Sequence, residues 1–514
     1  MYARTISASV FGIDAFRIEV ETHIDTGLPG FQIVGLPDSA VRESRERVMA
    51  AIKNSGYDIP ARKIMVNLAP ADVRKEGSAF DLPVAVGILA AYMKVVPKDL
   101  DGTVMLGELA FDGSLRTIHG VLPIALAMRG RRIRRMIVPV RNAGEAAIVD
   151  GVDVIPVSTL VEALEYLEGS RAIEPYHVDV DRMFETSPSV QMPDIHDVKG
   201  QEAVKRAMEV AAAGGHNMIM VGPPGAGKTM LAKRIATILP PLSLAEALET
   251  TKIHSVAGLL PSGTAMVTQR PFRAPHHTIS DAALVGGGVG VVRAGEISLA
   301  HHGVLFLDEV PEFQRNVLEV LRQPLEDKYI SIARSKMSVE YPANFMLVCS
   351  MNPCPCGQFG NAHQECTCSQ HDIQRYMSRI SGPLLDRIDI HVDVPAVRIH
   401  ELAGTGQGET SAVIRGRVVH ARRRQAARFE RSPHLHKNAD MSGKDVERYC
   451  RLDEESLNQL RTAMTRLGLS ARAYDRILKV SRTIADLAGT DAIDVGHVRE
   501  AIQYRSLDRP YWNG

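Results

Sequence analysis

The sequence predicts a multidomain α/β protein: two α/β domains, the second built on a parallel sheet, precede a domain made only of helices. Three observations predict this fold class. The chain has 514 residues, which is too many for one hydrophobic core. Strand-like and helix-like stretches alternate up to about residue 395. From residue 413 onward the apolar residues have only helical spacing.

The first expected domain covers residues 1–170. β-branched residues and Gly-Pro turns favour strands over residues 3–35, and Asp38 then precedes a stretch of helical periodicity that ends at Gly56. The alternation continues through a strand at 63–67, a helix at 81–92, a strand at 136–140 and a helix at 161–167. Residues 171–193 lose this periodicity and gather Pro and Ser, so we expect a linker there.

The second expected domain covers residues 194–396 and the third residues 413–514, with a flexible linker at 397–412. In the second domain, short apolar strands are each followed by a polar turn, and they lie at 217–221, 304–307 and 345–350. This order is typical of a parallel sheet whose ligand binds at the carboxyl ends of the strands. The third domain is expected to be a helical lid.

Composition excludes several classes of protein. With 45% hydrophobic and 23% charged residues, neither disorder nor a fibrous protein is indicated. Sixty basic residues balance sixty acidic ones, so any contact with DNA must come from a local patch or from the ring of an oligomer. The N-terminus lacks the pattern of a signal peptide, and no segment has about eighteen uninterrupted apolar residues. We therefore expect a cytoplasmic protein without membrane contact.

A phosphate-binding loop follows the expected strand at 217–221. The sequence GPPGAGKT fits G-x-x-x-x-G-K-[ST] and opens into an expected helix at 230–239. Its glycines let backbone N–H groups surround the phosphates, while the lysine reaches the β- and γ-phosphates and the threonine binds Mg²⁺. The residues expected to bind ATP are Gly222, Pro223, Pro224, Gly225, Ala226, Gly227, Lys228 and Thr229.

A second motif, VLFLDE at 304–309, is an apolar strand that ends in two carboxylates. Carboxylates at the end of a strand are usually just exposed to solvent. About 80 residues after a phosphate-binding loop, however, they indicate an ATPase. Asp308 is expected to hold the Mg²⁺ shell. Glu309 is expected to accept a proton from the attacking water.

The pair of motifs resembles the AAA+ superfamily, and the likeness extends further along the chain. FMLVCSMN (345–352) is similar to the strand that carries the sensor-1 residue. The resemblance implies that Asn352 orients the attacking water.

Two later segments resemble the AAA+ segments that carry catalytic arginines. SGPLLDRIDI is similar to the arginine-finger segment, which implies that Arg387 reaches the γ-phosphate held by a neighbouring subunit, with Arg379 as the next candidate. GLSARAYDRIL resembles sensor 2, with Arg472 as its cation. The alternative for each arginine is a surface ion pair.

The family resemblance is more specific than the superfamily. RPFRAPHHTISDAALVGGG and RAGEISLAHHGVLFLDE resemble the magnesium-chelatase ATPase subunit and the bacterial YifB/ComM group. Three N-terminal segments, at 27–56, 67–89 and 106–126, are similar to the N-domain of the YifB/ComM group. This N-domain favours the YifB/ComM group over the chelatases, and the likeness covers nearly the whole chain.

In the YifB/ComM group the N-domain resembles the proteolytic domain of Lon, which uses a Ser-Lys pair. Ser78 lies about where the Lon nucleophile would be, but Leu122 lies about where the lysine would follow. A hydroxyl without a base is a poor nucleophile. We therefore expect no protease activity, and a role for Ser78 at a helix N-terminus in a domain reused for assembly or DNA contact.

The resemblance implies a homohexameric ring that moves along branched or single-stranded DNA and drives branch migration in recombination or natural transformation. Residues 329–342 predict a β-hairpin with Arg334 and Lys336 at its tip, where related ring motors place a hairpin in the pore. Residues 129–135 and 421–428 are the other basic clusters, and a solvated surface is the usual alternative for such clusters.

Two other functional classes stay open. One is a chelatase-type ATPase that remodels a protein partner for metal insertion into a porphyrin. The other is a regulatory ATPase that acts on protein partners without DNA. Stimulation of ATP hydrolysis by DNA would separate the motor from both.

Four of the six cysteines form the pattern C-P-C-G-x₈-C-x-C just after Asn352, with His363 and His371 nearby. Four thiolates at such short range can satisfy tetrahedral zinc, although C-x-C is tighter than the usual spacing of zinc ligands. If zinc binds, it is structural, because all four positions are taken by protein. A loop of reduced thiols is the alternative. The cysteines are Cys354, Cys356, Cys366 and Cys368.

Overall fold

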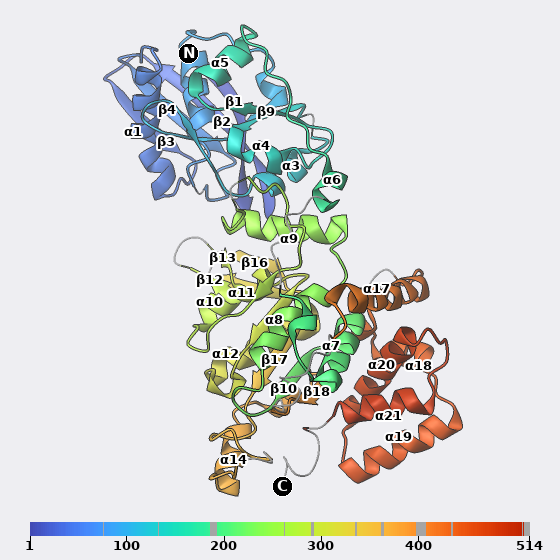
Figure 1. Ribbon diagram of the computed structural model, residues 1–514. Helices are drawn as coiled ribbons and strands as arrows, with labels where there is room; N and C mark the ends of the chain where they lie inside the picture. Colours follow the sequence, from blue (N-terminus) through green and yellow to red (C-terminus); the bar gives the residue numbers. More distant parts are fainter. Residues whose placement is uncertain are drawn as a thin grey trace.

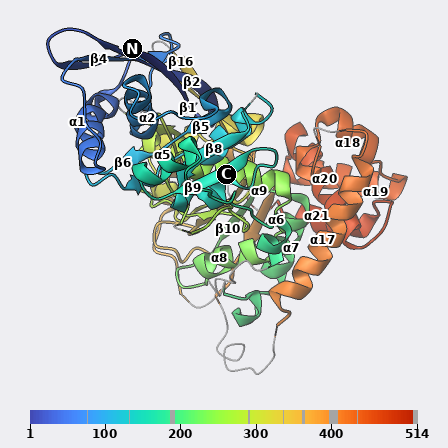
Figure 2. The ribbon, with the colours of Figure 1, turned by 90° about the horizontal axis from the view of Figure 1, so that it is seen from above.

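The structure is a computed structural model in which an N-terminal α/β part, a central α/β part and a group of C-terminal helices can be distinguished (Figure 1). Seen from above, the C-terminal helices lie beside the central part (Figure 2). Within the described part of the chain, no helix is both long enough and apolar enough to cross a membrane. The description covers all residues except 76, 132, 186–192, 262, 289–291, 335–336, 361–363, 397–407, 433–434, 506 and 508–514.

The N-terminal part is built on a seven-stranded mixed sheet in the order β3-β4-β2-β1-β5-β8-β9. β1 and β2 form an antiparallel hairpin, and β4 continues the antiparallel pairing on β2. The strands predicted for residues 3–35, 63–67 and 136–140 are confirmed. The strands are β1 (Tyr2–Phe11), β2 (Asp14–Asp25), β3 (Gly30–Val34), β4 (Lys63–Ala69), β5 (Thr103–Met105), β6 (Glu108–Leu109), β7 (Leu115–Arg116), β8 (Arg135–Pro139) and β9 (Asp153–Val157).

The predicted helices of the N-terminal part are also confirmed. Asp38 caps the first, because its carboxylate accepts the backbone N–H of Val41 at 2.8 Å. One short helix lies inside the segment predicted as a linker, so this segment is partly regular. The helices are α1 (Ser39–Asn54), α2 (Asp81–Ala91), α3 (Val121–Met128), α4 (Ala143–Ala146), α5 (Leu160–Glu168) and, in that segment, α6 (Val180–Glu185).

The central part contains the predicted parallel sheet, five strands in the order β11-β14-β17-β10-β18. Strands β10, β14 and β17 are buried along their whole length, and because the five strands are parallel their carboxyl ends meet at one edge. The strands are β10 (Met218–Val221), β11 (Phe272–Arg273), β14 (Val304–Leu307), β17 (Met346–Met351) and β18 (Ile390–Asp393). The predicted strands at 217–221, 304–307 and 345–350 thus form neighbouring strands of one sheet.

Helices and two hairpins surround this sheet. The hairpins are β12 (Gly286–Gly287) with β13 (Arg293–Ala294), and β15 (Tyr329–Arg334) with β16 (Met337–Pro342). The helices are α7 (Glu202–Gly214), α8 (Lys228–Ile238), α9 (Leu244–Val256), α10 (Asp281–Val285), α11 (Glu296–Leu299), α12 (Arg315–Glu319), α13 (Arg322–Asp327), α14 (Gln370–Met377) and α15 (Gly382–Leu385).

The C-terminal residues from 411 on form helices, and no strand occurs in their described part. Helices α17 and α20 pack on α7, so the helical group shares a hydrophobic core with the central sheet. The helices are α17 (Ser411–Arg428), α18 (Gly443–Tyr449), α19 (Glu454–Leu467), α20 (Ala471–Leu487) and α21 (Val495–Gln503).

Helix α9 joins the central part to the N-terminal part (Figure 1). Ser255 of α9 hydrogen-bonds to Glu145 of α4, and that buried carboxylate also accepts the backbone N–H of Leu122 at 2.9 Å. Leu242 and Ala247 are buried in the same hydrophobic cluster as α3. The two parts are therefore packed through a mixed apolar and polar contact.

Candidate nucleotide-binding and ATPase site

The phosphate-binding loop connects β10 to α8 and lies at the carboxyl edge of the central sheet. Gly225 and Gly227 have φ of +78° and +85°, a backbone region that glycine adopts without strain. At Gly222 a Cβ atom would lie 2.1 Å from the carbonyl oxygen of Val394, so a side chain does not fit there. Helix α8 begins at Lys228, and its N-terminus opens toward the loop, as an anion site requires.

Lys228 lies at the centre of the site. Its Nζ donates to the carbonyl oxygens of Gly222 and Pro223 at 2.7 and 2.9 Å, and to Asn352 Oδ1 at 3.0 Å. Burial lowers the pKa of Lys228, while the charges of Asp308 and Glu309 oppose this shift. The predicted phosphate-binding lysine and the predicted sensor 1 are therefore in direct contact.

The predicted Mg²⁺ ligands also meet. Thr229 Oγ1 donates to Asp308 Oδ2 at 2.6 Å, across the gap between α8 and the end of β14. A threonine hydroxyl and a carboxylate are oxygen ligands of the kind Mg²⁺ prefers, and phosphate oxygens and water would complete an octahedron. These two residues fit Mg²⁺ bound together with ATP.

One residue of this site was missed by the sequence reasoning. The hydroxyl of Ser350 in β17 hydrogen-bonds to Asp308 Oδ1. The signal was available, because Ser350 is a polar residue in an otherwise apolar, buried strand, two residues before Asn352. Glu309, the second acid of the pair, has φ of +54°, a left-handed backbone conformation that is uncommon for residues other than Gly, Asn and Asp.

Arg387 and Arg472 lie together at the opposite end of the sheet from the phosphate-binding loop. Asn217, which precedes β10, donates to the carbonyl oxygen of Arg387 at 2.9 Å, whereas the loop follows the other end of β10. Arg472 Nη1 lies 3.2 Å from Asp386 Oδ2. The structure thus brings the two predicted catalytic arginines to one place, away from this chain's own nucleotide site.

Helix α20, which carries Arg472, is fixed to the sheet by a buried polar group. Asp389 accepts a hydrogen bond from His216 at 3.0 Å and pairs with Arg476 of α20. Burial opposes ionisation, but the charge of Arg476 and the His216 hydrogen bond hold the pKa of Asp389 well below its usual value. A cavity of about 180 Å³ beside this group is lined by Glu326, Asp386, Arg387, Arg472, Asp475, Arg476 and Lys479.

The second arginine-finger candidate is in a different place. Arg379 Nη1 donates to the carbonyl oxygen of Pro311 at 3.1 Å and pairs with Glu312 at 3.2 Å, just after β14. It therefore lies at the carboxyl edge, on the side of this chain's own nucleotide site. Of the two arginine-finger candidates, Arg387 is the one that lies away from this chain's own nucleotide site.

The predicted hairpin at 329–342 is confirmed as β15 and β16. Arg334 is the last residue of β15 and pairs in register with Met337, so it lies next to the turn. Lys336 lies outside the described residues. In the middle of β16, Val339 is buried, and a Cβ at Gly12 would lie 2.6 Å from its Cγ1, so the hairpin rests on the β1–β2 turn.

Most arginines of the basic cluster at 421–428 make contacts within the chain. Arg424 pairs with Asp491 at 2.5 Å, and Arg428 pairs with the buried Asp486. Arg422 donates to the carbonyl oxygen of Ala212 at 3.0 Å. In the cluster at 129–135, Arg135 pairs with Asp99 at 2.9 Å, Arg131 and Arg134 are exposed, and residue 132 lies outside the described part.

The predicted lysine position of the Lon-like pair holds a buried leucine. Leu122 has no exposed surface in α3. Ser78, just before α2, hydrogen-bonds to Glu108, which in turn pairs with Arg116 at 3.4 Å. Lys75, three residues before Ser78, is buried and hydrogen-bonds to the carbonyl oxygen of Pro70. The N-cap of α2 is Phe80 and no side chain caps this helix, so the expected helix-capping role of Ser78 is wrong, and its hydroxyl binds a carboxylate instead.

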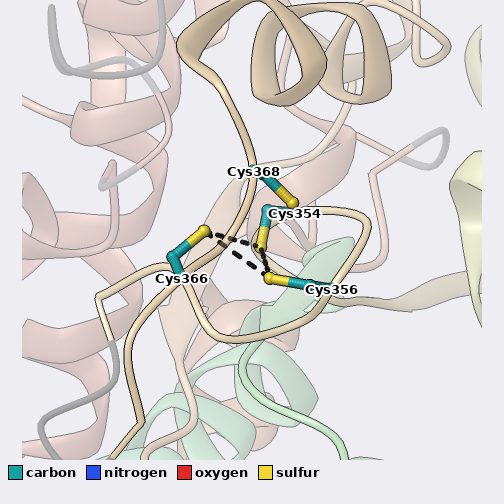
Figure 3. A group of neighbouring side chains, drawn as sticks. All are labelled: Cys354, Cys356, Cys366 and Cys368. Atoms are coloured by element: carbon teal, nitrogen blue, oxygen red, sulfur yellow. Dashed lines mark hydrogen bonds between the residues drawn. The ribbon is translucent and has the colours of Figure 1, made fainter.

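The four predicted thiols converge in one loop between β17 and α14, and their side chains point toward one another (Figure 3). Hydrogen bonds from the backbone N–H groups of Gln358 and Thr367 lower the pKa of Cys356 to about 5, whereas burial raises the pKa of Cys354 to about 12. His363 lies outside the described residues. All four are free thiols with no disulfide among them.

Comparison with known proteins agrees with the resemblance found in the sequence. Residues 194–402 match the family described as magnesium chelatase, subunit ChlI; residues 20–142 match subunit ChlI of Mg-chelatase; and residues 408–505 match its C-terminal family. YifB of Salmonella typhimurium is 44% identical over 506 residues, 98% of this chain and 96% of YifB.

Two further relatives extend this picture. Competence protein ComM of Haemophilus influenzae is 43% identical over 506 residues, 98% of this chain and 97% of ComM. Lon protease 2 of Bacillus subtilis is 26% identical over 169 residues, 30% of either chain, which gives the Lon-like prediction weak support.

Proposed function

The chain belongs to the YifB/ComM family of magnesium-chelatase-like AAA+ proteins, and from this premise we propose that it is an ATP-hydrolysing ring motor that drives branch migration of DNA. The family implies ATP hydrolysis with Mg²⁺. Coupling of hydrolysis to DNA, and action in recombination or natural transformation, are the further steps of the proposal. The printed name of the Haemophilus relative, a competence protein, supports a DNA role only in general terms.

One observation supports the proposal of a ring-shaped oligomer. The groups that bind ATP lie at the carboxyl edge of the sheet, and the two arginines that would neutralise the transition state lie at the other end. We infer that a single chain holds two halves of a site, at opposite ends of its sheet. Head-to-tail contact between copies would join these halves, and such contacts form a ring when the rotation between copies closes. We propose a homohexamer with one complete site at each interface.

The residues take the following roles in each interface. Lys228 and the N–H groups of the loop bind the phosphates, and Thr229 and Asp308 hold Mg²⁺. Glu309 accepts the proton of the attacking water, which Asn352 orients. Arg387 and Arg472 come from the neighbouring subunit and stabilise the charge that develops on the γ-phosphate. ATP bound with Mg²⁺ supplies the phosphoryl group that water attacks.

The direct test is ATP hydrolysis by the purified protein with no DNA and with single-stranded, duplex and branched DNA. We expect branched or single-stranded DNA to raise the rate at saturating ATP, because a motor hydrolyses faster on its track. Equal rates with and without DNA would contradict the motor. A rate raised only by a protein partner would instead favour the chelatase-type or regulatory ATPase.

A first prediction concerns the hairpin. Replacing Arg334 and Lys336 with Ala should leave basal ATP hydrolysis unchanged and abolish its stimulation by DNA, because six copies of the pair would form a positive ring that contacts phosphates. The slope of log affinity for DNA against log salt should also become shallower. The measurements are hydrolysis rates and DNA binding across a salt series.

Arg129→Ala with Arg131→Ala is the matched control, since it removes two exposed charges from the outer cluster. If the hairpin variant keeps full stimulation while this control loses it, the DNA path runs over the N-terminal part and not through the pore.

A second prediction concerns the contact that holds Arg387 in the isolated chain. Its side chain is only 11% exposed and pairs with Glu326 at the end of α13. Nη1 donates to the carbonyl oxygen of Pro383 at 2.5 Å. For Arg387 to reach a neighbouring phosphate, the pair with Glu326 must break. Glu326 lies three residues before β15, so movement of the hairpin would pull directly on this pair.

Glu326→Gln should therefore raise hydrolysis without DNA and reduce the further stimulation by DNA. Because Glu326 is 61% exposed, the pair is worth about 0.5–1 kcal/mol, so the expected rise is about two- to fivefold. Asp327→Asn, at the exposed neighbouring position, is the control. A lower basal rate in Glu326→Gln would mean that Glu326 positions Arg387 for catalysis and does not restrain it.

A further inference from the structure

We propose that Cys354, Cys356, Cys366 and Cys368 bind one zinc ion and that this ion fixes the loop that shapes the nucleotide site. The first half stands on the geometry of the thiols alone. The second half rests on the proposed function, because it assigns the loop a part in ATP binding.

The spacing of the four sulfur atoms matches a tetrahedral zinc site. Cys354 Sγ lies 3.4 Å from Cys356 Sγ and 3.6 Å from Cys366 Sγ, and the last two are 3.6 Å apart. All four sulfurs lie within 4.8 Å of one another. Zinc–sulfur bonds of about 2.3 Å in a tetrahedron put neighbouring sulfurs about 3.8 Å apart, so small movements would suffice.

The backbone around the thiols supports the same reading. Phe359 N–H donates to Cys354 Sγ at 3.3 Å, and Gly357 N–H donates to the carbonyl oxygen of Cys354 at 3.0 Å. Gly357 has φ of +78°, which lets the chain turn back sharply between the second thiol and the rest of the loop. N–H donors that orient the ligands are the usual outer contacts of a metal site. With four protein ligands there is no open position, so the zinc is structural.

A second group of potential metal ligands, Glu249 with His301 and His302, lacks this fit. His301 Nδ1 accepts the backbone N–H of Asn344 at 3.0 Å. In the neutral ring the proton must then be on Nε2, which faces Glu249 at 3.2 Å. The lone pair that a metal would need is occupied, and the group is a hydrogen-bonded contact between α9 and the start of β14.

One arm of the cysteine loop touches the phosphate-binding loop. A Cβ atom at Gly357 would lie 2.5 Å from Cδ of Pro224, so the backbone of Gly357 packs closely against the Pro224 ring. The arm starts directly after Asn352, which binds Lys228, and the residue before that, Met351, accepts the N–H of Gly222 at 3.2 Å. The position of Cys354 therefore restrains both the phosphate-binding loop and sensor 1.

The other arm of the cysteine loop leads toward the end of β14, where Asp308 and Glu309 lie. After Cys368, Ser369 caps α14 through hydrogen bonds with Asp372. Helix α14 ends at Met377, and two residues later Arg379 donates to the carbonyl oxygen of Pro311, which lies two residues after Glu309. A zinc ion that joins the two arms would thus connect the phosphate-binding loop, Asn352 and the end of β14.

The first experiment measures metal in the purified full-length protein. We expect about one zinc per chain by elemental analysis, and Co²⁺ exchanged into the site should show a thiolate charge-transfer band and the strong visible bands of tetrahedral cobalt. Cys366→Ser with Cys368→Ser should lose the metal, whereas Cys450→Ala, a buried cysteine of the helical group, should keep it. Protein without zinc, or the same zinc content in the double variant, would overturn the proposal.

The second experiment tests the contact between Gly357 and Pro224 separately from zinc binding. Gly357→Ala should retain zinc but weaken binding of a fluorescent ATP analogue by at least about tenfold, because its methyl group displaces Pro224. Gly360→Ala is a close control: its φ of +76° gives similar backbone strain, but its Cβ would meet no atom within 4 Å. Equal ATP binding by both variants, with zinc retained, would overturn the coupling. Neither readout involves DNA, so the motor proposal is tested separately.

Discussion

Glu309→Gln should bind ATP as tightly as the parent protein and lose at least about 100-fold in turnover. Lys228 and the loop that contact the phosphates are unchanged by this substitution, whereas an amide cannot accept the proton of the attacking water. Glu309 follows Asp308 directly after β14, and Asp308 already accepts hydrogen bonds from Thr229 and Ser350. The two acids therefore have separate tasks.

The measurement is single-turnover hydrolysis together with binding of a fluorescent ATP analogue. Glu319→Gln, at a half-buried glutamate of α12 that pairs with Arg322, controls for the loss of one negative charge. Lys228→Ala should instead weaken nucleotide binding itself. Full turnover in purified Glu309→Gln would show that another group activates the water.

Arg387→Ala should lower hydrolysis by about 1000-fold, the contribution expected of an arginine that stabilises the γ-phosphate from a neighbouring subunit. Because the residue acts across the interface, activity should return when this variant is mixed with Lys228→Ala protein. In a mixed ring, a Lys228→Ala subunit supplies Arg387 to a neighbour whose phosphate-binding loop is intact. In a random equal mixture about one quarter of the interfaces would be complete.

The experiment compares each variant alone with the mixture after exchange of subunits. Arg461→Ala, on the exposed side of α19, is the charge control. Normal hydrolysis by Arg387→Ala alone would show that the arginine finger is another residue. A mixture as inactive as its parts would show that Arg387 acts within its own chain.

The nucleotide-binding half of the site could be predicted from the sequence because each of its motifs lies directly beside the strand or helix that positions it. The loop GPPGAGKT follows a strand and opens a helix, and the acids at 308 and 309 end a strand, so position along the chain fixes position at the sheet edge. The strand at 304–307 has the predicted bounds. The helix predicted from residue 230 begins two residues earlier, at Lys228, because the loop already turns into the helix there.

The other half depends on long-range packing that the sequence does not reveal. Arg387 and Arg472 are 85 residues apart, and their meeting follows from the buried contact of Asp389 with His216 and Arg476. The contact of Arg387 with Glu326 and that of Ser350 with Asp308 likewise needed the fold. For the cysteines, the spacing left both zinc and free thiols open, and the fold, with its sharp turn at Gly357, brings the four sulfurs together.

The proposal that this protein is a branch-migration motor is tested most directly on a labelled four-way DNA junction. With ATP and Mg²⁺, the purified protein should convert the junction to two duplexes, and neither a non-hydrolysable ATP analogue nor Glu309→Gln should do so. Conversion that needs ATP hydrolysis and is lost in the Arg334 and Lys336 double variant is the result that the proposal predicts. A junction that stays intact under conditions in which the same protein sample hydrolyses ATP would contradict it.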